Sequence, residues 1–217
     1  GAICGVFLFA GYVFQTFGLR LTTAPKSAFI TGLSTVLVPL LAMLVYKTRP
    51  RIAELGGVTL ALAGMSLMTL EGPSLLAIEK GDLLTAICAV GFAAHIVTLG
   101  HYSQEGSFEW LSVTQLGTPA VLALSLFWWA EAPSLSWGPA VWGAIALTGL
   151  LATALAFTIQ SWAQQYTTAT RTALILTLEP LFAWGTSWVL TGETLSGRGI
   201  GGAALILAGI LLVEMKP

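Results

Sequence analysis

TTATRTALILTLEPLFAWGTSWVLT, residues 167–191, is the stretch of this sequence that decides the fold. It is an apolar run about long enough to cross the hydrocarbon core of a bilayer, roughly 30 Å thick, as one helix. A carboxyl side chain, Glu179, lies near its middle and is followed by Pro180. Its opening letters resemble a second run, TTAPKSAFITGL at residues 22–33. The stretch therefore predicts a membrane-spanning helix with an internal polar group and a distant copy elsewhere in the chain.

The composition of the whole chain favours lipid as its solvent. Hydrophobic residues make up 56% of the 217 residues, charged residues make up 9%, and the mean hydropathy is +0.85. Soluble domains carry about 25% charged residues. The net charge of −1 and the lack of a basic stripe argue against a nucleic-acid partner. The two cysteines, Cys4 and Cys88, lie in apolar runs without metal or redox spacing.

Eight apolar runs are each about long enough to span a membrane as a helix. They cover approximately residues 1–19, 26–46, 52–70, 82–100, 109–130, 139–162, 170–190 and 198–214. Short polar loops join them, so consecutive spans are expected to run antiparallel. The runs are continuous, whereas a membrane β-barrel needs alternating segments of about ten residues. The sequence therefore predicts an all-α, polytopic helical bundle.

Three prolines, Pro39, Pro119 and Pro180, fall inside the expected spans. Proline lacks a backbone donor and kinks a helix, and neighbouring helices can satisfy the freed carbonyls in a membrane. We expect kinks at these positions, which serve either simple packing or the shape of a site.

Small residues recur at a four-residue spacing that lets helix backbones approach closely. The pairs are Gly1/Gly5, Gly57/Ala61, Gly197/Gly201 and Ala204/Ala208. We expect them to mediate packing within the chain. The sequence leaves the oligomeric state open, with a homodimer as one option.

A shift of 145 residues aligns two regions of the chain without gaps. Gln15 meets Gln160, residues 22–24 meet 167–169, Lys26 meets Arg171, and Gly56-Gly57 meets Gly201-Gly202. The span at 1–19 then corresponds to the span at 139–162, which comes five spans later. Because an odd number of spans reverses direction across the membrane, the halves are predicted to be inverted repeats, as in many secondary transporters.

Each repeat unit then consists of five helices. Residues 80–216 supply a complete second unit, and residues 1–72 supply only the last three helices of the first. This comparison of the units predicts about two more spans before Gly1, so that eight helices of an expected ten are present.

Three pieces of the chain carry a family resemblance. They are LEPLFAWGTSWVLTGETLSGRGIGGAALILAGILLV at 178–213, TTAPKSAFITGLSTVLVPLLA at 22–42, and AVGFAAHIVTLG at 89–100. With them the chain resembles the EamA-type members of the drug/metabolite transporter superfamily. The resemblance implies ten helices in two inverted units, a central substrate cavity, and export or import of small metabolites. The chain departs from the pattern at Ser34-Thr35, where the second unit has Glu179-Pro180.

Glu179 and His95 are the titratable side chains that fall inside spans and invite a functional role. A charged carboxyl at the bilayer centre costs about 2.5–3.5 kcal/mol on insertion scales, so Glu179 is expected to face the bundle interior. It would carry a proton, contact a substrate, or bond carbonyls freed by Pro180. Histidine titrates near neutrality, so His95 would relay protons, bind substrate, or simply pack.

Polar and aromatic side chains elsewhere in the spans complete the set of expected cavity residues. Gln15 and Gln160 occupy equivalent positions, which suits either hydrogen bonding to a substrate or bonding between helices. Tyr12, Trp162 and Trp184 would form aromatic walls or face lipid.

Basic residues divide unevenly between the two membrane faces. One face receives Lys47, Arg49, Arg51, Arg171 and Lys216, and the other receives Arg20, Lys26, Lys80 and Arg198. The slight excess favours the first face as cytoplasmic. Lys26 and Arg171 open equivalent helices on opposite faces and are expected to extend toward lipid head groups.

The sequence has no HExxH, GxSxG or Walker loop, so it predicts no catalysis and no metal or cofactor. The prediction is a multi-pass protein of a bacterial inner membrane. It would transport small organic metabolites such as amino acids by alternating access, driven by a proton or ion gradient or by the substrate itself. The alternative is a non-transporting membrane scaffold or degenerate fragment. An intramembrane enzyme would need Glu179 and His95 within about 3.5 Å of each other.

Overall fold

The computed structural model describes residues 1–47, 49–70, 79–130, 137–192, 194 and 196–215. Within these ranges the chain forms helices and turns, with no strand. Eight helical stretches are long and apolar enough to cross a membrane. The prediction of an all-α, polytopic membrane bundle is confirmed. Lys216, counted above on the cytoplasmic face, lies outside the described residues.

The spans begin and end within two residues of the expected positions. The first three are α1 (Ala2–Leu19), α2 with α3 (Ala24–Gly32 and Ser34–Tyr46), and α4 (Ile52–Thr69). The next two are α5 (Lys80–Tyr102) and α6 (Phe108–Ala130). The sixth consists of α7 (Pro139–Leu147), the π-helical stretch η2 (Thr148–Leu155), and α8 (Ala156–Ala163). The last two are α9 with α10 (Ala169–Leu176 and Glu179–Thr191), and α11 (Gly197–Glu214).

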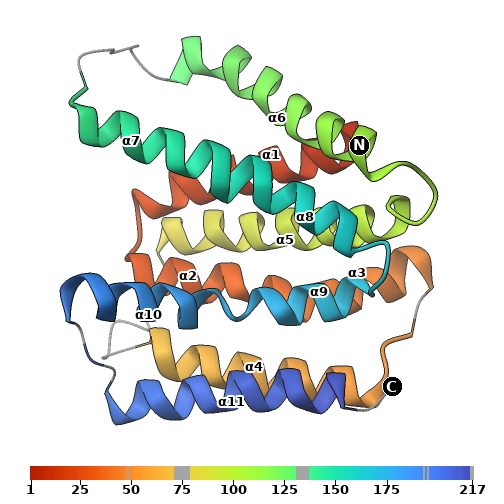
Figure 1. Ribbon diagram of the computed structural model, residues 1–217, viewed down its shortest axis with the longest axis vertical. Coiled ribbons are helices and arrows are strands. Elements are labelled where there is room, and N and C mark those ends of the chain that lie inside the picture. Colours follow the sequence, from red (N-terminus) through yellow and green to blue (C-terminus); the bar gives the residue numbers. More distant parts are fainter. Residues whose placement is uncertain (48, 71–78, 131–136, 193, 195, 216–217) are drawn as a thin grey trace.

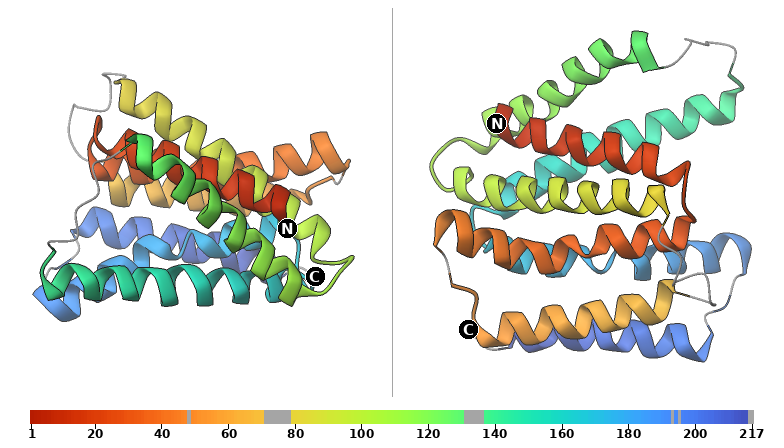
Figure 2. Two further views of the ribbon diagram at one scale, coloured as in Figure 1. Left: turned by 90° about the horizontal axis from the view of Figure 1, so that it is seen from above. Right: turned by 180° about the vertical axis from the view of Figure 1, so that it is seen from behind.

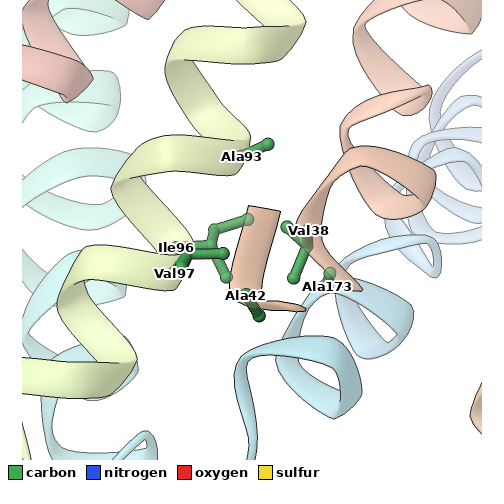
Figure 3. Packing of buried hydrophobic residues seen from close by; sticks show 6 residues of the cluster. All are labelled: Val38, Ala42, Ala93, Ile96, Val97 and Ala173. Carbon is green, nitrogen blue, oxygen red and sulfur yellow. The ribbon is translucent and has the colours of Figure 1, made fainter. Parts of the chain in front are cut away.

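The spans lie side by side in two layers (Figures 1 and 2). One layer contains α1, α5, α2 with α3, and α4, and the other contains α7 with α8, α9 with α10, and α11. α5 lies in the middle of the first layer, where it packs against α1, α2, α3 and α9. Small buried side chains let α3, α5 and α9 meet closely (Figure 3); they are Val38, Ala42, Ala93, Ile96, Val97 and Ala173.

Two of the expected continuous spans are broken near their middle. α2 gives way to α3 at Leu33, and α9 gives way to α10 at Thr177 and Leu178. At each break a backbone N–H group donates to the carbonyl oxygen three residues back, instead of four as in an α-helix. The distances are 3.1 Å from Leu33 N to Ile30 O and 3.0 Å from Leu178 N to Ile175 O. Each of these spans is therefore a pair of half-helices.

Proline explains these breaks only in part. Pro180 is the second residue of α10, a position where a helix has no internal partner for an N–H group. Thr35 stands at the corresponding place after the other break, which forms without a proline. Pro39 and Pro119 lie inside α3 and α6, and both helices continue through them. Packing around the breaks must therefore contribute.

α4 and α11 pack against each other through glycine. A Cβ atom on Gly64 would lie 2.4 Å from the carbonyl oxygen of Gly202, and one on Gly202 would lie 2.5 Å from that of Gly64. The same relation joins Gly57 and Gly209, at 2.7 and 2.6 Å. The two backbones therefore touch directly, as small residues allow in membrane helices.

A buried ion pair fixes the beginning of α2. Lys26 Nζ lies 2.5 Å from Asp82 Oδ2 of α5, and the two side chains are 12% and 8% exposed. Thr22 Oγ1 donates to Asp82 Oδ1 at 2.6 Å. The expectation that Lys26 extends toward lipid head groups is wrong, because a carboxylate on the neighbouring helix binds its ammonium group instead.

Candidate functional site

Three polar side chains from separate spans come together near the middle of the bundle. Tyr12 lies on α1, Thr153 lies in η2, and Glu179 is the first residue of α10. The Thr153 side chain and the Glu179 carboxyl both lie near enough to the Tyr12 hydroxyl to act on it electrostatically. Glu179 is exposed. We call these three residues the central cluster.

Irregular backbone presents two members of the central cluster. Glu179 follows the break between α9 and α10, and Thr153 belongs to the π-helical stretch. π-Helical turns inside α-helices frequently mark functional sites. Both irregularities thus lie next to members of the central cluster.

Aromatic rings surround Tyr12. Its ring meets Phe92 of α5 edge-on at a centroid distance of 5.7 Å, and it meets Phe157 of α8 edge-on at 6.3 Å. Phe157 in turn meets His95 edge-on at 5.5 Å. These rings form an apolar wall on one side of the central cluster and bring the spans at 1–19, 82–100 and 139–162 together there.

His95 belongs to a separate polar network in which every member is buried. His95 Nε2 lies 2.9 Å from Gln115 Oε1. Gln115 Nε2 donates to Ser161 Oγ at 2.6 Å and to the carbonyl oxygen of Phe157 at 3.2 Å. Because a carbonyl oxygen can only accept, the amide nitrogen of Gln115 must face Phe157, and His95 Nε2 is the donor to Oε1. In this arrangement His95 joins α5 to α6 and α8.

The two glutamines of the sequence repeat are not hydrogen-bonded to each other in the described part of the chain. Gln160 Nε2 donates to Gln164 Oε1 at 3.3 Å, and Gln164 Nε2 donates to the carbonyl oxygen of Ile96 at 3.1 Å. Gln15 is half-buried on α1, and within the described part of the chain no hydrogen bond links it to Gln160. Gln160 thus contributes to the contact between α8 and α5.

The two tryptophans of the expected site differ in their surroundings. Trp162 is 49% exposed and meets Tyr166 edge-on at 5.6 Å. Trp184 stacks on Trp188 of the same helix at 6.3 Å, and its indole Nε1 is buried without a hydrogen-bond partner among the described residues. Neither ring is in aromatic contact with Tyr12 in the described structure.

Thr153, Gln115 and Phe92 were not among the expected site residues. Thr153 is one hydroxyl in a long apolar run, and nothing in the sequence indicates that it lies near Tyr12. Gln115 is easier to notice in the sequence, because an amide side chain in the middle of a membrane span needs a hydrogen-bond partner within the protein. Its partner could not be identified from the sequence, because spacing along one helix does not say which residue of another helix lies opposite.

The described residues contain no group of three or more His, Cys, Asp or Glu side chains placed to hold a metal ion. The letters of residues 197–202 fit the GxGxxG pattern of dinucleotide-binding loops. They form the first turns of α11, however, and Gly202 packs against the α4 backbone. The pattern therefore serves helix packing here.

The whole chain matches one protein family. A family model described as the EamA-like transporter family matches residues 1–70 and 79–215. The chain belongs to this family. The family resemblance seen in the sequence is confirmed, and the protein is a multi-pass membrane transporter.

Two relatives of the EamA-like chain carry transporter names. An "Uncharacterized transporter" of Archaeoglobus fulgidus is 34% identical over 213 residues, which are 98% of this chain and 67% of that protein. "Uncharacterized transporter YyaM" of Bacillus subtilis is 28% identical over 218 residues, covering 96% of this chain and 70% of that protein. A solved crystal structure matches with a TM-score of 0.82 at 20% identity, covering 99% of this chain and 74% of the other. At that identity the likeness shows the fold alone.

Proposed function

We propose that this EamA-like protein is a secondary transporter of small organic metabolites such as amino acids, with the central cluster as its substrate site. The observation that carries the proposal is the exposed Glu179 carboxyl at the break of a membrane span. Ionisable groups inside a membrane are costly, and they typically mark substrate or ion pathways. A structural carboxyl would instead be enclosed by its partners.

The chemistry of the central cluster suits a solute with a cationic amino group. Glu179 supplies a negative charge, while Tyr12 and Thr153 supply hydroxyl groups for a polar end. The faces of Tyr12 and Phe157 would attract a cation that binds over them. In the proposed cycle the Glu179 carboxyl holds either a proton or the substrate's ammonium group, so that the two move in exchange.

Alternating access would come from two inverted units, residues 1–72 and 80–216. In support, α3 and α10 have bounds that differ by 145 residues at both ends, and so do α4 and α11. Lys47 and Gly192, also 145 residues apart, end α3 and α10 in the same left-handed conformation, with φ of 55° and 72°. Equivalent residues also meet across the units, as Tyr12 does with Phe157. Such pseudo-symmetry permits two states, related by a pseudo-two-fold axis in the membrane plane, around a midplane site.

The proposed location is a bacterial inner membrane. The loop between α3 and α4 would face the cytoplasm, because it carries Lys47, Arg49 and Arg51. The α9 end that carries Arg171 lies at the same end of the bundle (Figure 1).

Flux measurements on the full natural chain in proteoliposomes test the proposal. Labelled amino acids, amines and neutral metabolites would be offered with and without an imposed proton gradient. We expect uptake of at least one amino-bearing solute, and a loss of at least about tenfold in Glu179→Gln, because a cation site inside a membrane depends on its counter-charge. Glu105→Gln is the matched control, since Glu105 is an exposed carboxyl whose ion-pair partner is His101 at 3.7 Å.

Absence of flux for every solute offered would favour the non-transporting scaffold and refute the transport proposal. Flux that is equal in Glu179→Gln and in the unmodified protein would refute the assigned site. Size-exclusion profiles of each variant distinguish a lost site from a lost fold.

A further inference from the structure

The first copy of the repeated motif shows how this chain binds a carboxylate. Thr22 and Lys26, four residues apart at the beginning of α2, place a hydroxyl and an ammonium group on the two oxygens of Asp82. The distances are 2.6 and 2.5 Å. The pattern of a threonine followed four residues later by a basic residue is thus a carboxylate-binding arrangement in this protein.

The second copy presents the same kinds of donor to an open pocket. Thr167 and Arg171 follow Thr22 and Lys26 by 145 residues and lie at the beginning of α9, at the opposite end of the bundle (Figure 1). They line a pocket of about 660 Å³ together with Arg51, Glu54, Gln104 and Thr168, among others. We call this the α4–α9 pocket.

Electrostatics make the α4–α9 pocket attractive to an anion. Arg51 and Arg171 place two guanidinium groups on its wall. Arg51 is also the N-cap of α4 and Thr168 is the N-cap of α9, so two helix amino ends meet there. Helix amino ends carry partial positive charge and favour anions.

The carboxylate already in the pocket has other partners. Glu54 is buried and accepts the Arg51 backbone N–H at 3.0 Å and the Thr168 hydroxyl at 3.5 Å. Arg171 Nε, by contrast, is buried without a hydrogen-bond partner among the described residues. Buried donors are almost always satisfied, so a buried guanidinium donor without a partner indicates a ligand.

We propose that the α4–α9 pocket binds a carboxylate between Thr167, Arg171 and Arg51, as the first copy binds Asp82. The carboxylate belongs either to a solute that enters from this face or to an acidic side chain of the protein itself. The inference stands independently of the central cluster and of the direction in which substrate moves.

Thermal unfolding of the purified full natural chain in detergent tests this inference and separates the two sources. The unmodified protein, Arg171→Gln and the matched variant Lys26→Gln would be compared with and without succinate, at constant ionic strength set with sodium chloride. A solute site predicts that succinate raises the Tm of the unmodified protein by about 5–11 °C at a hundredfold excess over Kd. Arg171→Gln would show no such rise, and Lys26→Gln would keep it.

An internal carboxylate predicts a different result, in which succinate has no effect and Arg171→Gln lowers the Tm about as much as Lys26→Gln does. Arg171→Lys should restore most of the loss in either case, because it keeps the charge. If Arg171→Gln does not fold, Thr167→Val is used in its place, since it removes one donor and keeps the shape. The proposal is overturned if succinate has no effect and the substitution leaves the Tm unchanged, or if succinate raises the Tm of all variants equally.

Discussion

The contact between α4 and α11 predicts opposite effects for two adjacent glycines. Gly201 and Gly202 are neighbours on α11, and both would be changed to alanine. A Cβ atom on Gly202 would lie 2.5 Å from the Gly64 carbonyl oxygen, 2.7 Å from Met68 Cγ, and 3.2 Å from Leu67 Cβ. A Cβ atom on Gly201 would meet nothing within 4 Å. The two substitutions add the same methyl group to the same helix, so they differ only in what it meets.

The expected loss of stability in Gly202→Ala follows from the geometry of this contact. A carbon and a carbonyl oxygen approach to about 3.3 Å, so the Gly202→Ala methyl must move about 0.8 Å from the Gly64 oxygen. The Met68 side chain can rotate away, but the Gly64 carbonyl is helix backbone, and α4 must shift as a whole. Overpacking of this kind costs about 1–3 kcal/mol, against a gain of about 0.5–1 kcal/mol for replacing a helical glycine by alanine. We expect a net loss of about 1–2 kcal/mol for Gly202→Ala and no loss for Gly201→Ala.

Thermal unfolding in detergent, followed by tryptophan fluorescence, measures this difference. For a chain of this length the loss corresponds to a Tm lowered by about 2–8 °C in Gly202→Ala. Gly201→Ala should unfold at or slightly above the temperature of the unmodified protein. The reasoning is refuted if Gly202→Ala is as stable as the unmodified protein, or if Gly201→Ala loses as much, because the close backbone contact would then not limit stability.

Two further substitutions probe the polar contacts between spans. Gln115→Leu should lower stability by about 1–3 kcal/mol, because it leaves His95 Nε2–H without its acceptor and removes the amide that donates to Ser161 Oγ; an unchanged Tm would contradict the buried network. Asp82→Asn should cost about 1–2 kcal/mol, a modest figure because the pair with Lys26 lies at an end of the bundle close to water. The double variant with Lys26→Gln should cost less than the sum of the two single changes, and strict additivity would show that the pair contributes nothing.

The sequence was sufficient to predict the spans and their approximate ends. The requirement for about 20 apolar residues per crossing is a property of the bilayer and acts on each segment separately. The repeat could also be recognised from the sequence, because identical residues in the two units, such as the TTA triplets, can be compared without knowing how the helices pack. Glu179, on which the proposed site rests, could be picked out for the same reason: a carboxyl is conspicuous in an apolar run wherever its neighbours lie.

The sequence could not predict which faces of the spans contact each other, as the small-residue pairs illustrate. Gly57 does pack against α11, whereas a Cβ atom added to Gly197 or Gly201 would meet nothing within 4 Å. Spacing identifies a small face on a helix, but the rotation of that helix in the bundle decides whether the face meets a neighbour. The same holds for Lys26, whose ion pair with Asp82 depends on α2 and α5 being adjacent.

The sequence by itself determined that the chain is a membrane bundle of eight spans with repeated segments and one carboxyl near the middle of a span. Only the tertiary structure decided that two spans break into half-helices, that Thr153 of η2 lies near Tyr12, and that His95 is bonded to Gln115. The physical reason is that the hydropathy of a span is a sum over the residues of that span alone, so it can be read from the sequence. Breaks, π-helical turns and polar partners depend instead on which side chains neighbouring helices bring within a few ångströms.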